Sequence, residues 1–272
     1  MKDWKIRVKE ALNQVEKIVL ASNHENDIQY FNFHQKRYQR MAEQLGTFDE
    51  GASVLNIGSH YLHTTLLFQF LGFRVDSIEV AEFWELEFVK NRAKEFKIHP
   101  ILENHLETLT SLQQIEDKYD LILFTEILEH ITFNPIHFWS QIYRISKPKG
   151  CIYISTPNAF CLPNIVRSFV RLLTLRGIGI PVNEIFRNVT YGHHWKEYAG
   201  SEIQRYFHQL SDDFSVKINK YHYRHHDGNG LMGLSNKIFA FIGNLSYVFA
   251  DDIEAIVTIR KTGNWKLKSP EY

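Results

Sequence analysis

Two carboxylates and one imidazole stand within five consecutive positions of this 272-residue chain, at Glu126, Glu129 and His130. A spacing of three residues brings two side chains to one side of a helical turn, and the adjacent histidine can join them in a tight loop. Such a set is suitable for binding Mg²⁺, Mn²⁺ or Zn²⁺. The alternative is that Glu129 and His130 only make hydrogen bonds to the backbone.

Three short apolar runs end in polar residues that could share one site. The run at 54–57 is followed by Gly58, the second run ends at Glu79, and the run at 121–124 leads through Thr125 to Glu126. In an open parallel sheet, ligands bind outside the carboxyl ends of the strands. If these runs are strands of such a sheet, Gly58, Glu79 and Glu126 are candidates to line one crevice.

The elements that must position these residues alternate between strand and helix, which predicts a doubly wound, mostly parallel α/β sheet. Strands are expected at 52–57, 73–80, 100–102, 119–125 and 151–155, and helices at 2–22, 27–45, 61–71, 82–96 and 135–146, with a turn at 147–150. After residue 158, helices are expected at 162–177, 201–210 and 231–249. Strands are expected at 215–223 and 253–260, and these two strands would form an antiparallel pair at the edge of the sheet. The expected organisation is a helical extension at 1–50, a main domain at 51–262 with an insert at about 159–195, and a tail at 263–272.

Composition narrows the class of protein. An apolar fraction of 44% is enough for a sizeable core, and 31 basic residues balance 31 acidic ones, which counts against a nucleic-acid binder. Cys151 and Cys161 form neither a metal motif nor a disulfide framework, which is typical of a reducing cytoplasm. The first residues form a charged amphipathic stretch rather than a signal peptide, so a cytoplasmic location is expected.

Four motifs in order resemble those of class I S-adenosylmethionine (SAM)-dependent methyltransferases, over roughly residues 52–261. They are a strand running into a glycine loop at 54–59, a strand ending in an acidic residue at 72–79, the segment 119–130, and the segment 147–158. Each motif alone is weak, but four at the right spacing make a strong signal. The resemblance implies a Rossmann-like fold with an antiparallel last strand, SAM as the cofactor and methyl transfer as the reaction.

The resemblance also implies which residues hold SAM. Gly58 and the loop after it would meet the methionine part, Glu79 would accept hydrogen bonds from the ribose hydroxyls, and Glu126 would lie near the amino group or a metal. The expected cofactor-binding residues are Asn56, Gly58, Ser59, His60, Glu79, His105 and Glu126, with His105 near the adenine.

The glycine loop departs from the family pattern at His60 and Leu62. Glycine is usual there because a Cβ would obstruct the close approach of backbone to ligand. Either the loop lies slightly farther from SAM, or the site has lost SAM and the chain is a non-catalytic binding protein with a methyltransferase fold. Because Glu79 and Glu126 are both present, retention of SAM is favoured.

Residues 192–198 resemble a segment of ubiquinone-biosynthesis O-methyltransferases and small-RNA 2′-O-methyltransferases. In those families the segment supplies a histidine to a metal held by a Glu-x-x-Glu-His motif, and His194 is the matching residue, with His193 beside it. The implied metal site is Glu126, Glu129, His130 and His194, where a cation would lower the pKa of a substrate hydroxyl. His194 and His130 are the catalytic candidates. Without a metal, His194 would be a general base, or the two adjacent histidines would only cap the pocket.

The expected acceptor is a small molecule, a sugar or a lipid-linked compound, methylated on oxygen. An RNA 2′-O-methyltransferase is the alternative, and the neutral net charge counts against it. Residues 162–177 place arginines among apolar residues, which fits a lid over the substrate, a packed helix or peripheral contact with an anionic membrane. Residues 221–227 are rich in histidine but lack a known metal spacing, so a strand end and a polar loop are favoured there.

Overall fold

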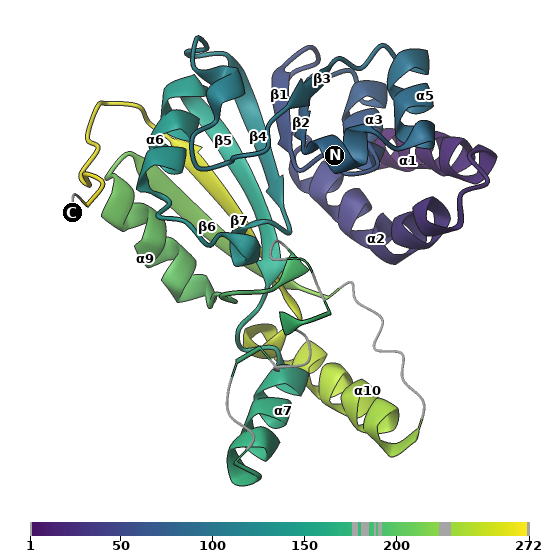
Figure 1. Cartoon of the computed structure of the whole chain (residues 1–272), viewed down its shortest axis with the longest axis vertical. Coiled ribbons are helices and arrows are strands. Elements are labelled where there is room, and N and C mark those ends of the chain that lie inside the picture. Colours follow the sequence, from purple (N-terminus) through teal and green to yellow (C-terminus); the bar gives the residue numbers. More distant parts are fainter. Residues whose placement is uncertain are drawn as a thin grey trace. The chain divides into compact units, whose positions relative to one another are not determined.

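Seven strands form one sheet in the computed structural model, which describes residues 2–175, 179–180, 185–187, 189, 192–222 and 230–270. They are β1 (Ser53–Ile57), β2 (Arg74–Glu79), β3 (Pro100–Leu102), β4 (Tyr119–Thr125), β5 (Ser146–Pro157), β6 (Phe214–Tyr221) and β7 (Asp252–Ile259). Their order in the sheet is β3-β2-β1-β4-β5-β7-β6 (Figure 1). β2 pairs in parallel with β1 and β3, whereas β6 and β7 are antiparallel. The Rossmann-like, mostly parallel fold expected from the sequence is therefore confirmed.

The chain forms two compact units, and each takes part of its sequence from inside the range of the other. The first comprises Met1–Leu123 and His137–Cys151, and the second comprises Phe124–Ile136 and Ile152–Tyr272. Strands β4 and β5 therefore contribute residues to both units. The boundaries expected from the sequence at residues 50 and 262 stay predictions.

The first unit contains helices whose apolar faces are buried. They are α1 (Lys2–Ala21), α2 (Glu25–Gln44), α3 (His63–Phe70), α4 (Ala81–Trp84), α5 (Glu87–Glu95) and nearly all of α6 (Ile136–Ile145). Val8, Leu12 and Val15 recur at helical spacing on α1 and are buried, where α1 packs against α2 and α3. The Trp4 indole donates a hydrogen bond to the Ala42 carbonyl at 2.9 Å and fastens α1 to α2.

The single helix expected at 82–96 is wrong, because this segment forms α4 and α5. Leu86 has extended backbone angles, with φ of −64° and ψ of 128°, and separates the two helices. The Trp84 indole donates to the Ile101 carbonyl of β3 at 3.3 Å, which fixes α4 against the strand. No glycine or proline marks the break, so the sequence pattern gave no signal for this tertiary effect.

The turn expected at 147–150 is also wrong, because these residues belong to β5. The Lys147 ammonium pairs with Asp120 of β4 at 2.8 Å, which holds this part of the strand beside its neighbour. Of these four residues, only Lys149 has a left-handed φ, of 66°. The Lys-Pro-Lys-Gly sequence therefore makes a local irregularity within a strand rather than a turn.

The described helices of the second unit are α7 (Leu162–Leu173), α9 (Gly200–Leu210) and α10 (Gly230–Leu245), with 3-10 turns η2 (Leu128–His130) and η4 (Tyr247–Phe249). α9 packs on β6 and β7 through Ile203 and Phe207, which are fully buried. The helices expected to reach residues 177 and 249 end at Leu173 and Leu245; residue 177 itself and residues 223–227 lie outside the described part. Among the described residues, no helix is long and apolar enough to cross a membrane.

Candidate functional site

The loop between β1 and α3 turns sharply at the carboxyl end of β1. Gly58, His60 and Leu62 have left-handed backbone angles, with φ of 70°, 47° and 67°. The N–H groups of Gly58 and Ser59 both donate to the Ile78 carbonyl of β2, at 3.0 and 3.1 Å. The loop is therefore tied to the end of β2.

Side chains compensate for the glycines absent from this loop. Leu62 is completely buried, and the His60 ring stacks on Tyr30 of α2 with centroids 4.2 Å apart and planes at 25°. The Phe83 ring of α4 also lies 4.2 Å from His60. A left-handed residue other than glycine costs about 1–2 kcal/mol. Packing of the His60 and Leu62 side chains thus stabilises left-handed backbone conformations that glycine usually adopts.

Glu79, the last residue of β2, joins the loop to the strand end. Its carboxylate accepts the N–H of His60 at 2.6 Å and the N–H of Val80 at 2.8 Å. Burial raises the pKa of Glu79, although these two hydrogen bonds act in the opposite direction. Each carboxylate oxygen keeps a further lone pair, so Glu79 can still accept hydrogen bonds from two ligand hydroxyls.

Three polar atoms in and beside the loop have no hydrogen-bond partner among the described residues: Asn56 Oδ1, Ser59 Oγ and His60 Nδ1. Buried polar atoms are normally paired, so these atoms mark positions for the polar groups of a ligand. SAM carries amino, carboxylate and hydroxyl groups, and these residues fit it in chemical type. His105, expected near the adenine, is exposed after β3, and its N–H donates to the Glu103 carboxylate at 3.2 Å.

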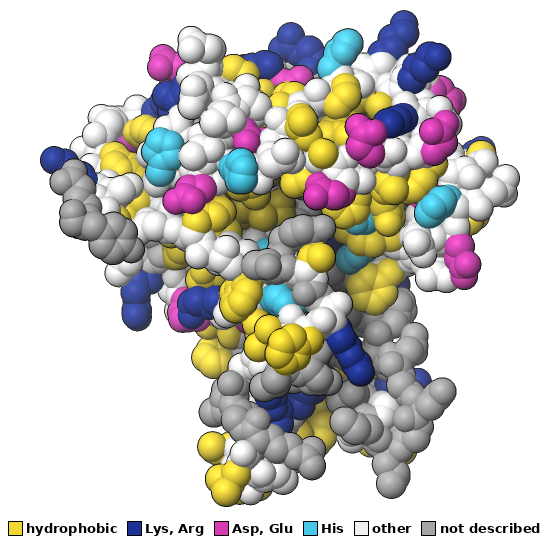
Figure 2. All heavy atoms as spheres, viewed as in Figure 1, with side chains coloured by type: hydrophobic (Ala, Val, Ile, Leu, Met, Phe, Trp, Pro, Cys, Tyr) yellow, Lys and Arg dark blue, Asp and Glu magenta, His cyan; other side chains and the backbone are white. Residues whose placement is uncertain are grey.

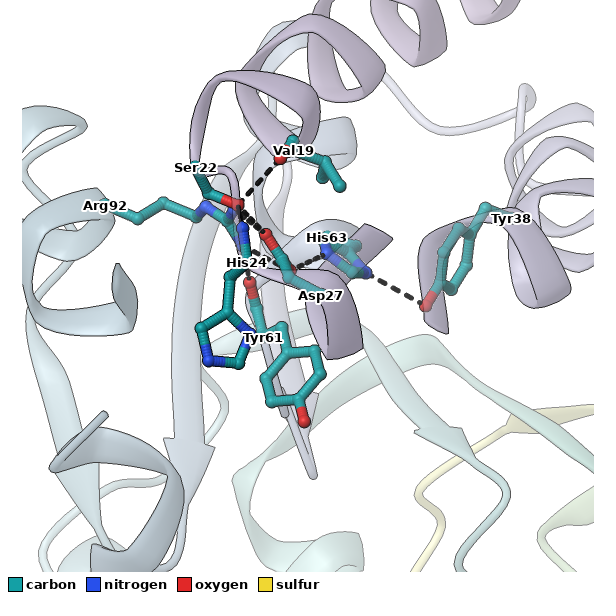
Figure 3. Close-up of polar contacts among 8 residues, drawn as sticks. All are labelled: Val19, Ser22, His24, Asp27, Tyr38, Tyr61, His63 and Arg92. Atoms are coloured by element: carbon teal, nitrogen blue, oxygen red, sulfur yellow. Dashed lines mark hydrogen bonds and ion pairs between the residues drawn. The ribbon is translucent and has the colours of Figure 1, made fainter. Parts of the chain in front are cut away.

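A buried carboxylate connects this loop to α2 and α5 (Figure 3). Asp27 of α2 is fully buried and lies 2.6 Å from Arg92 Nη2 and 2.7 Å from His63 Nε2. The Ser22 hydroxyl donates to the same carboxylate at 2.9 Å, and Arg92 donates to the Tyr61 carbonyl at 2.5 Å. Because Tyr61 lies in the loop and His63 begins α3, the network fixes where the loop ends.

The partners in this network determine its protonation states. Burial would raise the pKa of Asp27, but the hydrogen bonds from His63 and Arg92 outweigh it and lower that pKa to about 2. Burial lowers the pKa of His63 despite the adjacent carboxylate. We therefore assign a charged Asp27–Arg92 pair and a neutral His63. The Nε2–H of His63 donates to the Asp27 carboxylate, and Nδ1 of His63 accepts a hydrogen bond from the Tyr38 hydroxyl at 3.4 Å.

Acid should therefore destabilise the first unit in two stages. A group with a depressed folded pKa stabilises the fold fully above its unfolded pKa, and this contribution is lost as the pH falls towards the folded value. The contribution of His63 is lost as the pH falls below 6.5, the ordinary pKa of histidine. The contribution of Asp27 is lost between pH 3.8, its ordinary pKa, and pH about 2. The Asp27 shift corresponds to roughly 2–3 kcal/mol.

Urea unfolding midpoints, measured at successive pH values from neutral to acid, should fall in both ranges. An Asp27→Asn variant should begin less stable and lose less across the lower range. A wild-type midpoint that stays constant below pH 6.5 would contradict the assignment of a neutral His63.

The second group of predicted residues lies in the turn that follows β4. Glu126 has a left-handed φ of 55°, and its N–H donates to the Ser155 carbonyl at 2.8 Å. The Ser155 hydroxyl donates to the Glu126 carboxylate at 2.9 Å. The turn η2 then places Glu129 in the interior and leaves His130 half-buried beside it.

Glu129, His130 and His194 form a cluster whose ligand atoms all lie within 4.8 Å of one another. A second polar atom of each side chain has its own partner: Thr156 Oγ1 at 2.9 Å from Glu129 Oε2, the His193 carbonyl at 2.9 Å from His130 Nδ1, and Glu197 Oε1 at 3.3 Å from His194 Nδ1. Since a carbonyl and a carboxylate only accept, both imidazoles carry a proton on Nδ1, and in a neutral imidazole of this kind the lone pair lies on Nε2. Partners of this kind orient side chains that bind metals.

Glu129 is the buried member of the cluster, and its Oε1 has no hydrogen-bond partner among the described residues. Burial, and then the charge of Glu126, raise the pKa of Glu129 to about 8, against the opposite effects of His194 and Thr156. A buried carboxylate without a compensating positive charge is costly. A divalent cation would supply that charge, so the donor set fits such an ion.

The structure thus brings together three of the four residues predicted to bind a metal. Glu126 lies outside this cluster in the part of the chain that the structure describes, and it pairs with Ser155 instead. Glu79 and its loop belong to the first unit and the cluster to the second, so one shared crevice stays a prediction.

The sequence did not identify Thr156 and Glu197, which orient the cluster. Thr156 stands at the carboxyl end of β5, and strand ends of this kind commonly carry site residues. Glu197 follows His194 by three residues, a separation at which side chains can meet in one turn. Both positions were therefore recognisable in principle from their place in the chain.

The fold and these residues together define a class I SAM-dependent methyltransferase. Residues 27–212 match the family model described as a methyltransferase domain, and the chain belongs to this family. The match begins at Asp27, so most of α2 lies within the matched range. The chain therefore carries a methyltransferase domain.

Individual relatives are more distant. The mitochondrial ubiquinone biosynthesis O-methyltransferase of Dictyostelium discoideum is 27% identical over 168 residues, and the match spans 58% of this chain and about half, 49%, of that protein. A SAM-dependent methyltransferase from Archaeoglobus fulgidus has a TM-score of 0.52 at 17% identity, covering 84% of this chain and 99% of the other. The YcgJ protein of Bacillus subtilis has a TM-score of 0.50 at 16% identity, covering 84% and 100%. These structural matches establish the fold alone.

Proposed function

We propose that this enzyme transfers the SAM methyl group to a hydroxyl oxygen of a small-molecule, sugar or lipid-linked acceptor. The observation that carries the proposal is the cluster of Glu129, His130 and His194, in which the buried Glu129 Oε1 accepts no hydrogen bond from the described residues. Similarity to an O-methyltransferase of ubiquinone biosynthesis supports oxygen as the methylated atom. We assign this cluster to the acceptor, and the loop at Gly58 with Glu79 to SAM.

The reaction needs few chemical groups from the protein. The acceptor oxygen bonds to the methyl carbon while the carbon–sulfur bond breaks, S-adenosylhomocysteine leaves, and the hydroxyl proton passes to a base. SAM supplies a positively charged sulfur, so the methyl group is already electrophilic and the main task of the protein is positioning. An imidazole lone pair, as on His194 Nε2, can take the proton near neutral pH.

Glu129 Oε1 and the Nε2 atoms of His130 and His194 would hold a divalent cation. When bound, the cation would supply a Lewis acid that lowers the pKa of the acceptor hydroxyl. One carboxylate oxygen and two imidazole nitrogens favour Zn²⁺ or Mn²⁺ over Mg²⁺, which prefers oxygen ligands.

Titration calorimetry with Mn²⁺ or Zn²⁺ alone tests the cluster without an identified acceptor. We expect binding to the full chain, weakened roughly 10–100-fold by Glu129→Gln, which removes the negative charge of the carboxylate, or by His194→Ala, which removes a ligand nitrogen. His193→Ala is the matched control, because this neighbour contributes its backbone carbonyl to His130 and keeps it after substitution.

Thermal unfolding of each variant separates loss of a ligand from loss of the fold. If the wild type binds neither Mn²⁺ nor Zn²⁺, the metal assignment fails and His194 would act as the general base. If His193→Ala weakens binding as much as His194→Ala, the assignment of His194 is wrong.

A further inference from the structure

Helix α10 exposes five of its large apolar side chains and buries small residues at described positions. Leu234, Ile238, Phe241, Ile242 and Leu245 are between 46% and 75% exposed. Their spacing of four, three, one and three residues puts all five on one face of the helix. Among the helix positions whose burial is described, Gly233, Ala240 and Gly243 are buried. A helix that packs on a protein core shows the reverse arrangement, so the described part of the chain leaves this apolar face exposed.

Helix α7 adds a second exposed apolar face in the same unit. Phe169, Val170, Leu172 and Leu173 are between 52% and 68% exposed and follow the apolar side of the helix. α7 and α10 pack against each other (Figure 1). A Cβ added at Gly243 would lie 3.4 Å from the Leu162 Cβ. The two helices therefore form one element, which we call the α7–α10 pair.

The charges of the α7–α10 pair have one sign. Neither helix contains an aspartate or glutamate, whereas Arg167 and Arg171 lie on α7 and Lys237 on α10. The whole chain, in contrast, has as many acidic as basic residues. Figure 2 shows hydrophobic and basic side chains together in the region of α7. Exposed apolar faces with only basic charges are complementary to a surface that is apolar inside and negatively charged outside.

We propose that the α7–α10 pair docks onto a membrane rich in anionic lipid, with the apolar side chains among the acyl chains and the basic ones at the headgroups. Neither helix crosses the bilayer, because the described helices are too short or too polar to do so. A peripheral position would give the enzyme access to an acceptor that is itself held in the lipid. The docking itself does not depend on which acceptor is used.

Sedimentation of the full chain with sucrose-loaded vesicles tests the proposal. We expect strong binding to phosphatidylcholine vesicles that contain about one-third phosphatidylglycerol, weak binding to phosphatidylcholine alone, and release at high salt. Phe241→Ser with Leu245→Ser should weaken binding at least tenfold, because the favourable transfer of two apolar side chains from water into the acyl chains is lost. Arg167→Gln with Arg171→Gln should weaken binding about 25-fold, at about fivefold for each charge.

Matched controls come from the first unit. Ile6 and Leu20 of α1 are 53% and 51% exposed, so Ile6→Ser with Leu20→Ser changes comparable apolar surface elsewhere. Lys9→Gln with Lys94→Gln removes two exposed charges. Both control variants should bind vesicles like the wild type.

A fluorescent label gives a second measurement that does not depend on affinity. Cys151 and Cys161 are buried, so a polarity-sensitive dye can be attached selectively at Leu245→Cys or Leu20→Cys. Its emission should shift to the blue on anionic vesicles at position 245 alone. Absence of binding to these vesicles, or equal losses in the control variants, would overturn the proposal. A wild-type dimer that dissociates in Phe241→Ser would do so as well, because a second copy would then cover the face.

Discussion

Replacing Asp27 with alanine should lower the free energy of unfolding by about 3–5 kcal/mol, because it leaves the buried Arg92 guanidinium without its carboxylate. Both side chains of this pair are at most 2% exposed. The variant should also loosen the loop between β1 and α3, since Arg92 and His63 hold the C-terminal end of this loop through Asp27. Urea unfolding followed by tryptophan fluorescence measures the first effect, and hydrogen exchange at residues 58–63 measures the second.

An exposed ion pair provides the control for this experiment. Lys90 and Glu85 are also 2.6 Å apart, but their side chains are 49% and 70% exposed. Glu85→Ala should therefore cost no more than about 1 kcal/mol. An Asp27→Leu, Arg92→Met double variant should recover part of the stability lost in Asp27→Ala, because it leaves no buried charge unpaired. Equal losses in Asp27→Ala and Glu85→Ala would show that burial does not decide the strength of the pair.

Replacing Glu79 with alanine should weaken binding of SAM and of S-adenosylhomocysteine about 100-fold. The estimate follows from two hydrogen bonds to a charged acceptor, each contributing about 1.5 kcal/mol or more. Alanine also leaves the N–H of His60 without its acceptor at the centre of the loop. Calorimetry with both ligands measures the effect, and Glu79→Gln separates the role of the charge from that of the shape.

Asp76 is a matched control on the same strand. It lies three residues before Glu79, and its carboxylate pairs with Lys118 at 2.6 Å and accepts the Tyr119 hydroxyl at 2.9 Å. Asp76→Ala should therefore leave the affinity for SAM within about twofold of the wild type. If Glu79→Ala binds SAM as tightly as Asp76→Ala does, Glu79 is not the ribose ligand.

Most of the sheet could be predicted from the sequence because its strands are short apolar runs bounded by turn residues. The pattern failed where tertiary contacts decide the local structure. The sequence pattern predicts one helix at 82–96, but the structure has two helices that are separated at Leu86. The ion pair of Lys147 with Asp120 keeps residues 147–150, which contain a proline and a glycine, within a strand. Patterns of single residues carry no information on such partners, which are distant in sequence.

The candidate site shows the same division. Glu129 and His130 are adjacent in sequence and were recognisable from type and spacing, whereas Asp27 and Arg92 meet across 65 positions and gave no local signal. Likewise, the sequence showed that His60 and Leu62 replace glycines. It could not show that Tyr30 stacks on His60 and that Leu62 is buried. These contacts explain why the loop keeps its left-handed turns without glycine.

The interleaved course of the two units bears on how the chain matures during its synthesis. All residues of the first unit have been made once Cys151 has been added, whereas the second unit then lacks everything after that residue. Domains generally fold as units, N-terminal parts first, as a chain leaves the ribosome. Glu129 and His130 have then already been synthesised, whereas His194, the third residue of their cluster, has not. The loop at residues 58–62 and its buried support can thus reach their final form while the cluster of Glu129, His130 and His194 is still incomplete, so the two groups of residues are assembled one after the other.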